Sequence, residues 1–176
     1  AVNQSSEQID DVQLAISLIL ESFDYRHSGR FSRLFSPKID KLLFAATKAD
    51  HVTAEQHNKL VSLLNQLVHQ ARQELSYDNI AMKTLALASV QATKAGKSQY
   101  QGKEIPVLQG RQLSDNKTIT LFPGSVPSKL PSKAHWPEQG FHYISFAPYQ
   151  SIASHEALPH MRMDQVMQFL LGDKMQ

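Results

Sequence analysis

The first regular pattern along the chain is a set of apolar residues that recur every three or four positions, namely Ile9, Val12, Ile16, Ile19 and Phe23. This spacing places them on one face of a helix. It predicts an amphipathic helix over residues 8–26 that ends near Gly29, because glycine commonly follows a last helical turn. Residues 27–38 are rich in Ser and Arg, which predicts a loop or a short helix.

Two short apolar runs flank a second helical pattern. Residues 42–46 form a continuous apolar run whose length suits a buried parallel strand. A helix is predicted over residues 54–75, and Thr53 and Gln56 at its start resemble a capping box. Residues 80–88 predict a second strand. This order is typical of a βαβ unit, in which the strands lie parallel and the crossover is right-handed.

The composition changes after residue 100. Residues 121–150 hold five of the eight prolines and six of the fourteen aromatic residues. Short extended segments are predicted at 104–109, 117–122 and 141–146, and apolar spacing predicts a short helix over 163–171. These patterns indicate a small β-rich subdomain followed by a terminal helix.

Composition and charge exclude several classes of protein. The chain has 176 residues, which suits one domain or a core with a small appendage. Its net charge of +2 gives no reason to expect nucleic-acid binding. The absence of cysteine excludes disulfides, thiolate zinc sites and a cysteine nucleophile, and it fits a cytoplasmic protein. No apolar run approaches the roughly 20 residues of a membrane span.

A Thr-Lys-x-Asp pattern directly follows the first predicted strand, with Thr47, Lys48 and Asp50 in its polar positions. Ligands of open α/β sheets bind outside the carboxyl ends of the strands, so the pattern has the position of a binding loop. We expect the Asp50 carboxylate to accept hydrogen bonds from guanine N1–H and the exocyclic amine. Adenine lacks both donors and would leave the carboxylate desolvated and unpaired. The Lys48 stem would lie along the base while its ammonium stays in water.

The second predicted strand ends in Leu-Ala-Ser-Val-Gln at residues 87–91. GTPases carry a Ser-Ala-Lys-like turn after the corresponding strand, and the amides of that turn meet the base carbonyl. Ser89 and Val90 occupy this turn here, with Val90 in place of the commoner Ala. So short a pattern says little by itself, but its place after the expected strand and helix supports a base-recognition role.

Four segments together resemble the bacterial YcjX-like proteins: Phe-Ala-Ala-Thr-Lys-Ala-Asp-His at 44–51, Tyr-Asp-Asn-Ile-Ala at 77–81, Leu-Phe-Pro-Gly at 121–124 and Phe-Leu-Leu-Gly-Asp-Lys at 169–174. The resemblance covers the whole chain, as the C-terminal portion of the family. It implies a P-loop NTPase linked to stress and the phage-shock response, with nucleotide binding and triphosphate hydrolysis. The Thr-Lys-x-Asp pattern favours GTP or GDP over ATP. Thr47 departs from the Asn that is usual in GTPases.

The resemblance and the change in composition together predict a domain organisation. Residues 1–100 are expected to be the C-terminal part of a P-loop NTPase core of α/β class, with a parallel sheet and flanking helices. Residues 101–150 are expected to be the β-rich subdomain, and residues 151–176 a C-terminal helix that packs back on the core. The expected location is the cytoplasm, with peripheral attachment to the inner membrane left open.

The motifs for phosphate and magnesium binding are not found in this sequence. Gly-Lys-Ser at 96–98 lacks the first Gly of G-x-x-x-x-G-K-[ST], since position 91 is Gln91, and it is predicted to be a loop. No strand ends in Asp-x-x-Gly either. We therefore predict no catalytic residues here, and Mg²⁺ binding only together with a part that precedes Ala1. The pair His155 and His160 has the wrong spacing for a zinc site.

Two alternatives remain open. The chain is a non-enzymatic interaction module if the β-rich segment 101–150 binds a partner, such as a membrane-associated stress protein. Arg26, Arg30 and Arg33 form either a solvated loop or a positive face for phosphate or acidic lipid. A self-sufficient hydrolase has no supporting group of residues.

Overall fold

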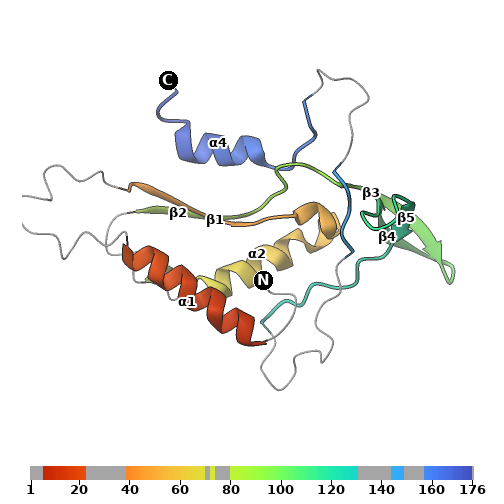
Figure 1. Ribbon diagram of the computed structural model, residues 1–176, viewed down its shortest axis with the longest axis horizontal. Helices are drawn as coiled ribbons and strands as arrows, with labels where there is room; N and C mark the ends of the chain where they lie inside the picture. Colours follow the sequence, from red (N-terminus) through yellow and green to blue (C-terminus); the bar gives the residue numbers. More distant parts are fainter. Residues whose placement is uncertain are drawn as a thin grey trace, which may run out of the picture.

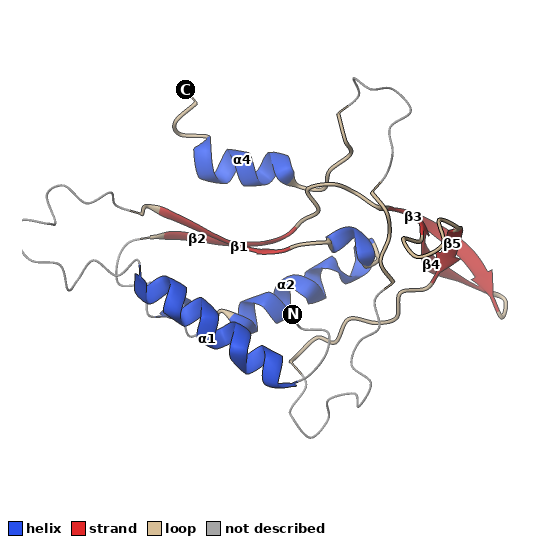
Figure 2. Ribbon diagram, in the orientation of Figure 1, coloured by secondary structure: helices blue, strands red, loops and turns tan. Residues whose placement is uncertain are grey.

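The computed structural model describes residues 6–22, 39–69, 72–73, 80–130, 144–148 and 157–175. These residues form a mixed α/β structure with two separate sheets (Figure 2). The elements are α1 (Ser6–Ser22), β1 (Lys41–Ala46), the 3₁₀ turns η3 (Ala49–His51) and η4 (Ala54–Gln56), α2 (His57–Leu67), β2 (Ala81–Ala86), β3 (Thr93–Tyr100), β4 (Lys103–Arg111), β5 (Thr118–Leu121) and α4 (Met163–Leu171). Among the described helices, none has the length and apolar character needed to cross a bilayer.

The first sheet consists of β1 and β2, which pair in parallel from Lys41↔Ala81 to Ala46↔Ala86. The helix α2 lies between them in the chain, which confirms the predicted strand–helix–strand order. Figure 1 shows α1 and α2 on one side of this sheet and α4 on the other. The predicted terminal helix is also confirmed, because α4 occupies residues 163–171. The first predicted helix is present as α1, and residues 23–26 lie outside the described part of the chain.

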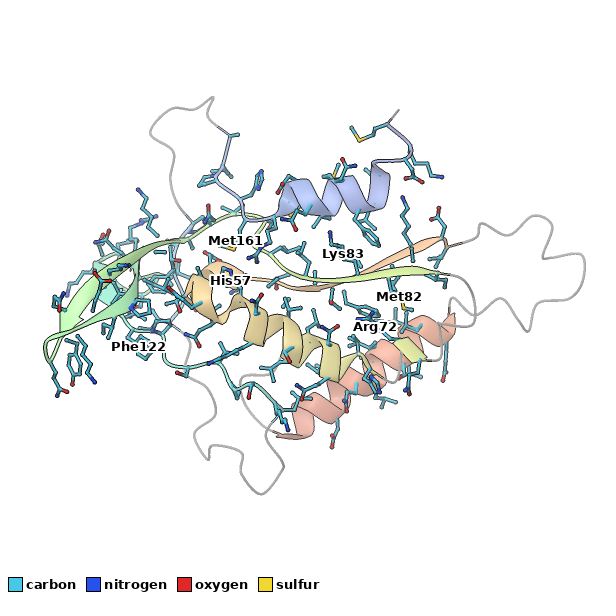
Figure 3. All side chains as sticks on the ribbon, turned by 180° about the vertical axis from the view of Figure 1, so that it is seen from behind. His57, Arg72, Met82, Lys83, Phe122 and Met161 are labelled. Carbon is cyan, nitrogen blue, oxygen red and sulfur yellow. The ribbon has the colours of Figure 1, made fainter. Side chains whose placement is uncertain are left out.

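Alternation along the strands explains this layering. Leu42 and Phe44 of β1 and Met82 of β2 pack around Leu20 of α1. The neighbouring Lys83 points the other way, and its ammonium nitrogen lies 5.7 Å from the Phe169 ring centroid on α4 (Figure 3). Successive strand residues point to opposite faces, so the apolar side chains meet α1 and the lysine stem meets α4.

The first strand is less buried than the sequence predicts. Residues 41–44 of β1 are half-buried and Ala45 is exposed. Among the described residues, β1 has a strand partner on one edge only, which is β2. A strand at the edge of a sheet lacks the cover that a neighbour on each side provides.

The second sheet is antiparallel, with strand order β3-β4-β5, and lies beside the carboxyl ends of β1 and β2 (Figure 1). The extended segments predicted at 104–109 and 117–122 correspond to β4 and β5. The loop predicted at 96–98 is wrong, because these residues lie within β3. All of β3 after Thr93 is exposed, so it offers no apolar alternation from which a strand can be read. Of the segment predicted at 141–146, Phe146 forms an isolated bridge, and 141–143 lie outside the described residues.

A segment following β5, residues 122–130, runs along α2 and is held at its start by Gln56. The Gln56 side-chain amide nitrogen donates to the Gly124 carbonyl at 2.7 Å, and its oxygen accepts from the Val126 amide. The same nitrogen donates to the Thr53 hydroxyl at 3.2 Å. The predicted capping box is therefore wrong, since Thr53 makes no side-chain cap to the helix and Gln56 holds this segment instead.

Gln66 repeats the contact further along α2. Its side chain donates to the Ser128 carbonyl and accepts from the Leu130 amide, both at 3.1 Å. Ten helical residues from Gln56 to Gln66 advance about 15 Å. The two glutamines therefore hold residues 122–130 at two places, one just before α2 and one near its end.

Candidate functional site

The two loops singled out by the sequence lie side by side. Leu87, which follows β2, donates its amide to the Ala46 carbonyl at 2.9 Å, and the Ala49 amide donates to the Leu87 carbonyl at 3.0 Å. The parallel pairing of β1 and β2 causes this, because parallel strands end at the same edge of a sheet. Thr47, Lys48 and Asp50 thus stand next to the turn after β2.

Thr47 and Lys48 are exposed where β1 ends. Lys48 has φ 58° and ψ 36°, a left-handed conformation that costs a non-glycine residue about 1 kcal/mol or more. This turn directs the chain into η3, where Ala49 is completely buried. An exposed Lys therefore precedes a tightly packed residue.

Asp50 lies deeper than expected, with 2% of its surface exposed. One carboxylate oxygen, Oδ2, accepts a hydrogen bond from the Ala92 amide at 2.7 Å. Its backbone carbonyl accepts from the Thr93 hydroxyl. The carboxylate therefore already joins η3 to the start of β3. A carboxylate has about four positions that accept hydrogen bonds, and the Ala92 amide uses one of them.

Ser89 and Val90 form the bend that follows β2, with Ser89 exposed and Val90 half-buried. The C-terminal segment supports this bend. Ala88 and Met161 exchange two backbone hydrogen bonds of 3.1 and 2.8 Å. The Gln91 amide donates to the Pro159 carbonyl at 2.8 Å.

Sequence reasoning missed two residues beside these loops, His57 and Arg162. His57 is the first residue of α2 and is 6% exposed (Figure 3). Its Nε2 lies 2.9 Å from the Ala49 carbonyl, and its Nδ1 lies 3.1 Å from the Arg162 guanidinium. The other guanidinium nitrogen, Nη1, donates to the Ala86 carbonyl at 2.7 Å. The two residues lie 105 positions apart in the chain, so no local pattern indicates their contact.

His51, the last residue of η3, contacts the second sheet. Its ring meets the Phe146 ring edge-on, with centroids 5.4 Å apart. Burial lowers the pKa of His51 below its usual 6.5, the nearby Asp50 opposes this shift, and Lys48 adds to it. Phe146 in turn covers Gly110 of β4, where an added Cβ would lie 2.6 Å from its ring. The candidate site is therefore tied to the antiparallel sheet through aromatic packing.

Within the described ranges, no three His, Asp or Glu side chains come close enough together to hold a metal ion. Gly96 lies in β3 and turns no phosphate-binding loop there. His155 and the predicted arginine cluster, which comprises Arg26, Arg30 and Arg33, lie outside the described residues.

The sequence profile of the YcjX-like family, DUF463, matches residues 1–175. The chain is 47% identical over 174 residues to a protein named Ras-like GTPase YcjX from Escherichia coli strain K12, covering 99% of this chain and 37% of that protein. It is 38% identical over 179 residues to a Ras-like GTPase YcjX from Shewanella oneidensis, covering 100% of this chain and again 37% of the relative. The chain thus spans little more than a third of the curated relatives that it matches, and by its match along residues 1–175 it belongs to the YcjX-like family.

Proposed function

We propose that this chain supplies the guanine-recognition part of a P-loop GTPase. One observation carries the proposal: the Thr-Lys-x-Asp loop and the Ser-Val turn follow adjacent parallel strands, and Leu87, at the end of the second strand, is hydrogen-bonded to both Ala46 and Ala49. That edge is where open α/β sheets bind ligands. The two relatives are named Ras-like GTPases, which agrees with a guanine nucleotide as the ligand.

Each residue has a separate role in this proposal. Asp50 accepts hydrogen bonds from guanine N1–H and the 2-amino group, the exposed Lys48 covers one face of the base, and Thr47 lies beside it. The amides of Ser89 and Val90 meet the base carbonyl. ATP fits less well, because adenine offers no donor to the carboxylate.

The burial of Asp50 gives the proposal a further requirement. The base reaches the carboxylate beside the turn at 89–92, whose residues are exposed or half-buried. Guanine binding therefore requires residues 89–92 to move so that the base reaches the Asp50 carboxylate. During this movement the Ala92 amide either stays bonded to Asp50 or gives up that bond. A change in the hydrogen exchange of residues 89–92 on addition of GDP is the expected sign.

The remaining parts of the enzyme belong to the rest of the family's chain. The proposal assigns to it the phosphate-binding loop, the Mg²⁺ ligands and the strands that would extend the sheet from the open edge of β1 into a P-loop NTPase sheet. The intact protein would then hydrolyse GTP. The resemblance adds a role in a bacterial stress response to this proposal.

Titration of the intact protein with GDP tests the proposal. Asp50→Ala should abolish measurable binding, because it removes the carboxylate that accepts both hydrogen bonds from the base. Asp40→Ala is the matched control, since Asp40 is an exposed carboxylate at the start of β1, the opposite end of that strand. Unchanged GDP affinity in Asp50→Ala would show that base recognition lies elsewhere.

A second candidate function is partner binding by the antiparallel sheet. Tyr100, Leu113 and Phe122 lie on or beside this sheet and are between 50% and 61% exposed. The interaction-module alternative requires such exposed apolar side chains to meet a protein partner. Tyr100→Ser together with Leu113→Ser would then abolish capture of that partner while GDP affinity stays unchanged.

A further inference from the structure

We propose that Arg162, acting through His57, positions Asp50 for guanine, so that base discrimination depends on the segment leading into α4. The inference rests on the guanine site proposed above. Arg162 and His57 touch no base in this proposal and are positioning residues. Their contacts form a continuous path to the peptide group that precedes Asp50.

The path begins at Arg162, which occupies the N-cap position of α4 and has a left-handed backbone conformation with φ 60°. From there its guanidinium crosses to the first sheet and donates to two acceptors. Nη1 bonds the Ala86 carbonyl at the end of β2 at 2.7 Å, and Nη2 lies 3.1 Å from His57 Nδ1. One side chain therefore ties α4, β2 and α2 together.

The chemistry of the guanidinium fixes the state of His57. Arginine has donors and no acceptor, so His57 Nδ1 must accept and carries no proton. The proton of the neutral imidazole is then on Nε2, which donates to the Ala49 carbonyl at 2.9 Å. A hydrogen bond from a charged group orients its acceptor firmly, so Arg162 selects both the tautomer and the ring position.

The Ala49 carbonyl belongs to the peptide group that ends at the Asp50 nitrogen. The Ala49 amide is held by the Leu87 carbonyl at 3.0 Å, so the backbone before Asp50 is fixed on both sides of Ala49. Beyond Asp50, its carbonyl is held by Thr93. His57 and the Val52 amide thus hold the peptide group before Asp50, Thr93 holds the one after it, and the Ala92 amide bonds the carboxylate itself.

The segment before Arg162 holds the second loop as well. Met161 exchanges two backbone hydrogen bonds with Ala88, and the Pro159 carbonyl accepts from Gln91. Residues 159–162 therefore contact both sides of the turn that contains Ser89 and Val90, and they reach Asp50 through His57. Two loops that must meet one base are aligned by a single short segment.

The test compares GDP with inosine diphosphate on the intact protein by calorimetric titration. Inosine lacks the 2-amino group, so the affinity ratio reports one of the two bonds to Asp50. A bond to a charged acceptor predicts a ratio of about 10 or more in the parent protein. Arg162→Ala should reduce this ratio at least about fivefold, because the carboxylate loses its fixed orientation. Loss of folded protein alone lowers the number of sites and leaves the ratio unchanged.

Arg72→Ala is the matched control. Arg72 also bonds a side chain of α2, donating to Asn65 Oδ1 at 2.7 Å, and lies toward the end of α2 opposite His57 (Figure 3). This variant should retain the parent ratio. His57→Phe should match Arg162→Ala, and the double variant should show no further loss, because Arg162 acts through His57.

The outcomes separate the two proposals. A parent protein with no preference for GDP over inosine diphosphate would refute the guanine site itself. A parent preference that Arg162→Ala keeps within about twofold would overturn the positioning role alone. If Arg162→Ala does not fold, Arg162→Lys decides the matter, since lysine is unable to bridge both acceptors in the same geometry. An unchanged ratio in Arg162→Lys would overturn the inference, and a reduced one would support it.

Discussion

Replacing Gln56 with alanine tests how residues 122–130 are held against α2. Gln56 is 7% exposed and bonds the Val126 amide and the Gly124 carbonyl. Val126 is itself buried, at 7% exposure, against Val52 and Leu63. The Gln56→Ala variant therefore leaves a buried N–H without a partner.

The expected cost follows from this burial. An unsatisfied buried backbone group costs about 1–3 kcal/mol, which corresponds to about a 5- to 150-fold faster exchange of the Val126 amide. Gln66 provides the matched comparison, because it makes the same pair of bonds to more exposed partners. Its replacement with alanine should accelerate exchange of the Leu130 amide only about two- to fivefold, since water replaces the lost partner.

Hydrogen exchange on the intact protein, resolved to single amides by NMR, measures both effects under the same conditions. The expected result is a large acceleration at Val126 in Gln56→Ala and a small one at Leu130 in Gln66→Ala. Equal effects in the two variants would refute the reasoning from burial. No acceleration in either variant would show that these glutamines do not hold the segment.

Two further predictions concern the contact between η3 and the antiparallel sheet. Gly110→Ala should destabilise the protein by about 1–3 kcal/mol in thermal unfolding, because its Cβ would lie 2.6 Å from the Phe146 ring; the loss should shrink when Phe146→Ala is added, and a purely additive double variant would contradict the clash. An NMR titration should give His51 a pKa below 6.5. Its contribution to stability is then complete above pH 6.5 and is lost as the pH falls through the pKa of the folded state. Phe146→Ala should raise this pKa, and an unchanged value would argue against burial as the cause.

The elements that could be predicted from the sequence are those whose pattern is local. Apolar residues recur at helical spacing in α1 and α4 and form a continuous run in β1. These patterns arise because the apolar side chains lie where each element packs on a neighbour. The strand β3 was not recognisable, because nearly all its residues are exposed and its pairing with β4 supplies the stability. Local propensity does not report a partner strand.

The candidate site divides in the same way. Thr47, Lys48 and Asp50 were recognisable because their spacing and their place after a strand are local features. The burial of Asp50 and its bond to Ala92 were not, since these depend on a contact across 42 positions. Arg162 was unpredictable for the same reason, because the two acceptors that it bonds, the Ala86 carbonyl and His57 Nδ1, lie far away in the chain.

The Asp50→Asn exchange in the intact protein tests the central claim most directly. Asparagine keeps a side-chain oxygen that accepts from the Ala92 amide, so the contact between η3 and β3 survives. It replaces the guanine acceptor with a donor that fits the 2-oxygen of xanthine. The account predicts that GDP affinity falls by about 10- to 150-fold and that xanthosine diphosphate becomes the preferred ligand. Unchanged GDP affinity with no gain for xanthosine diphosphate would contradict it and leave Asp50 as a structural link between the two sheets.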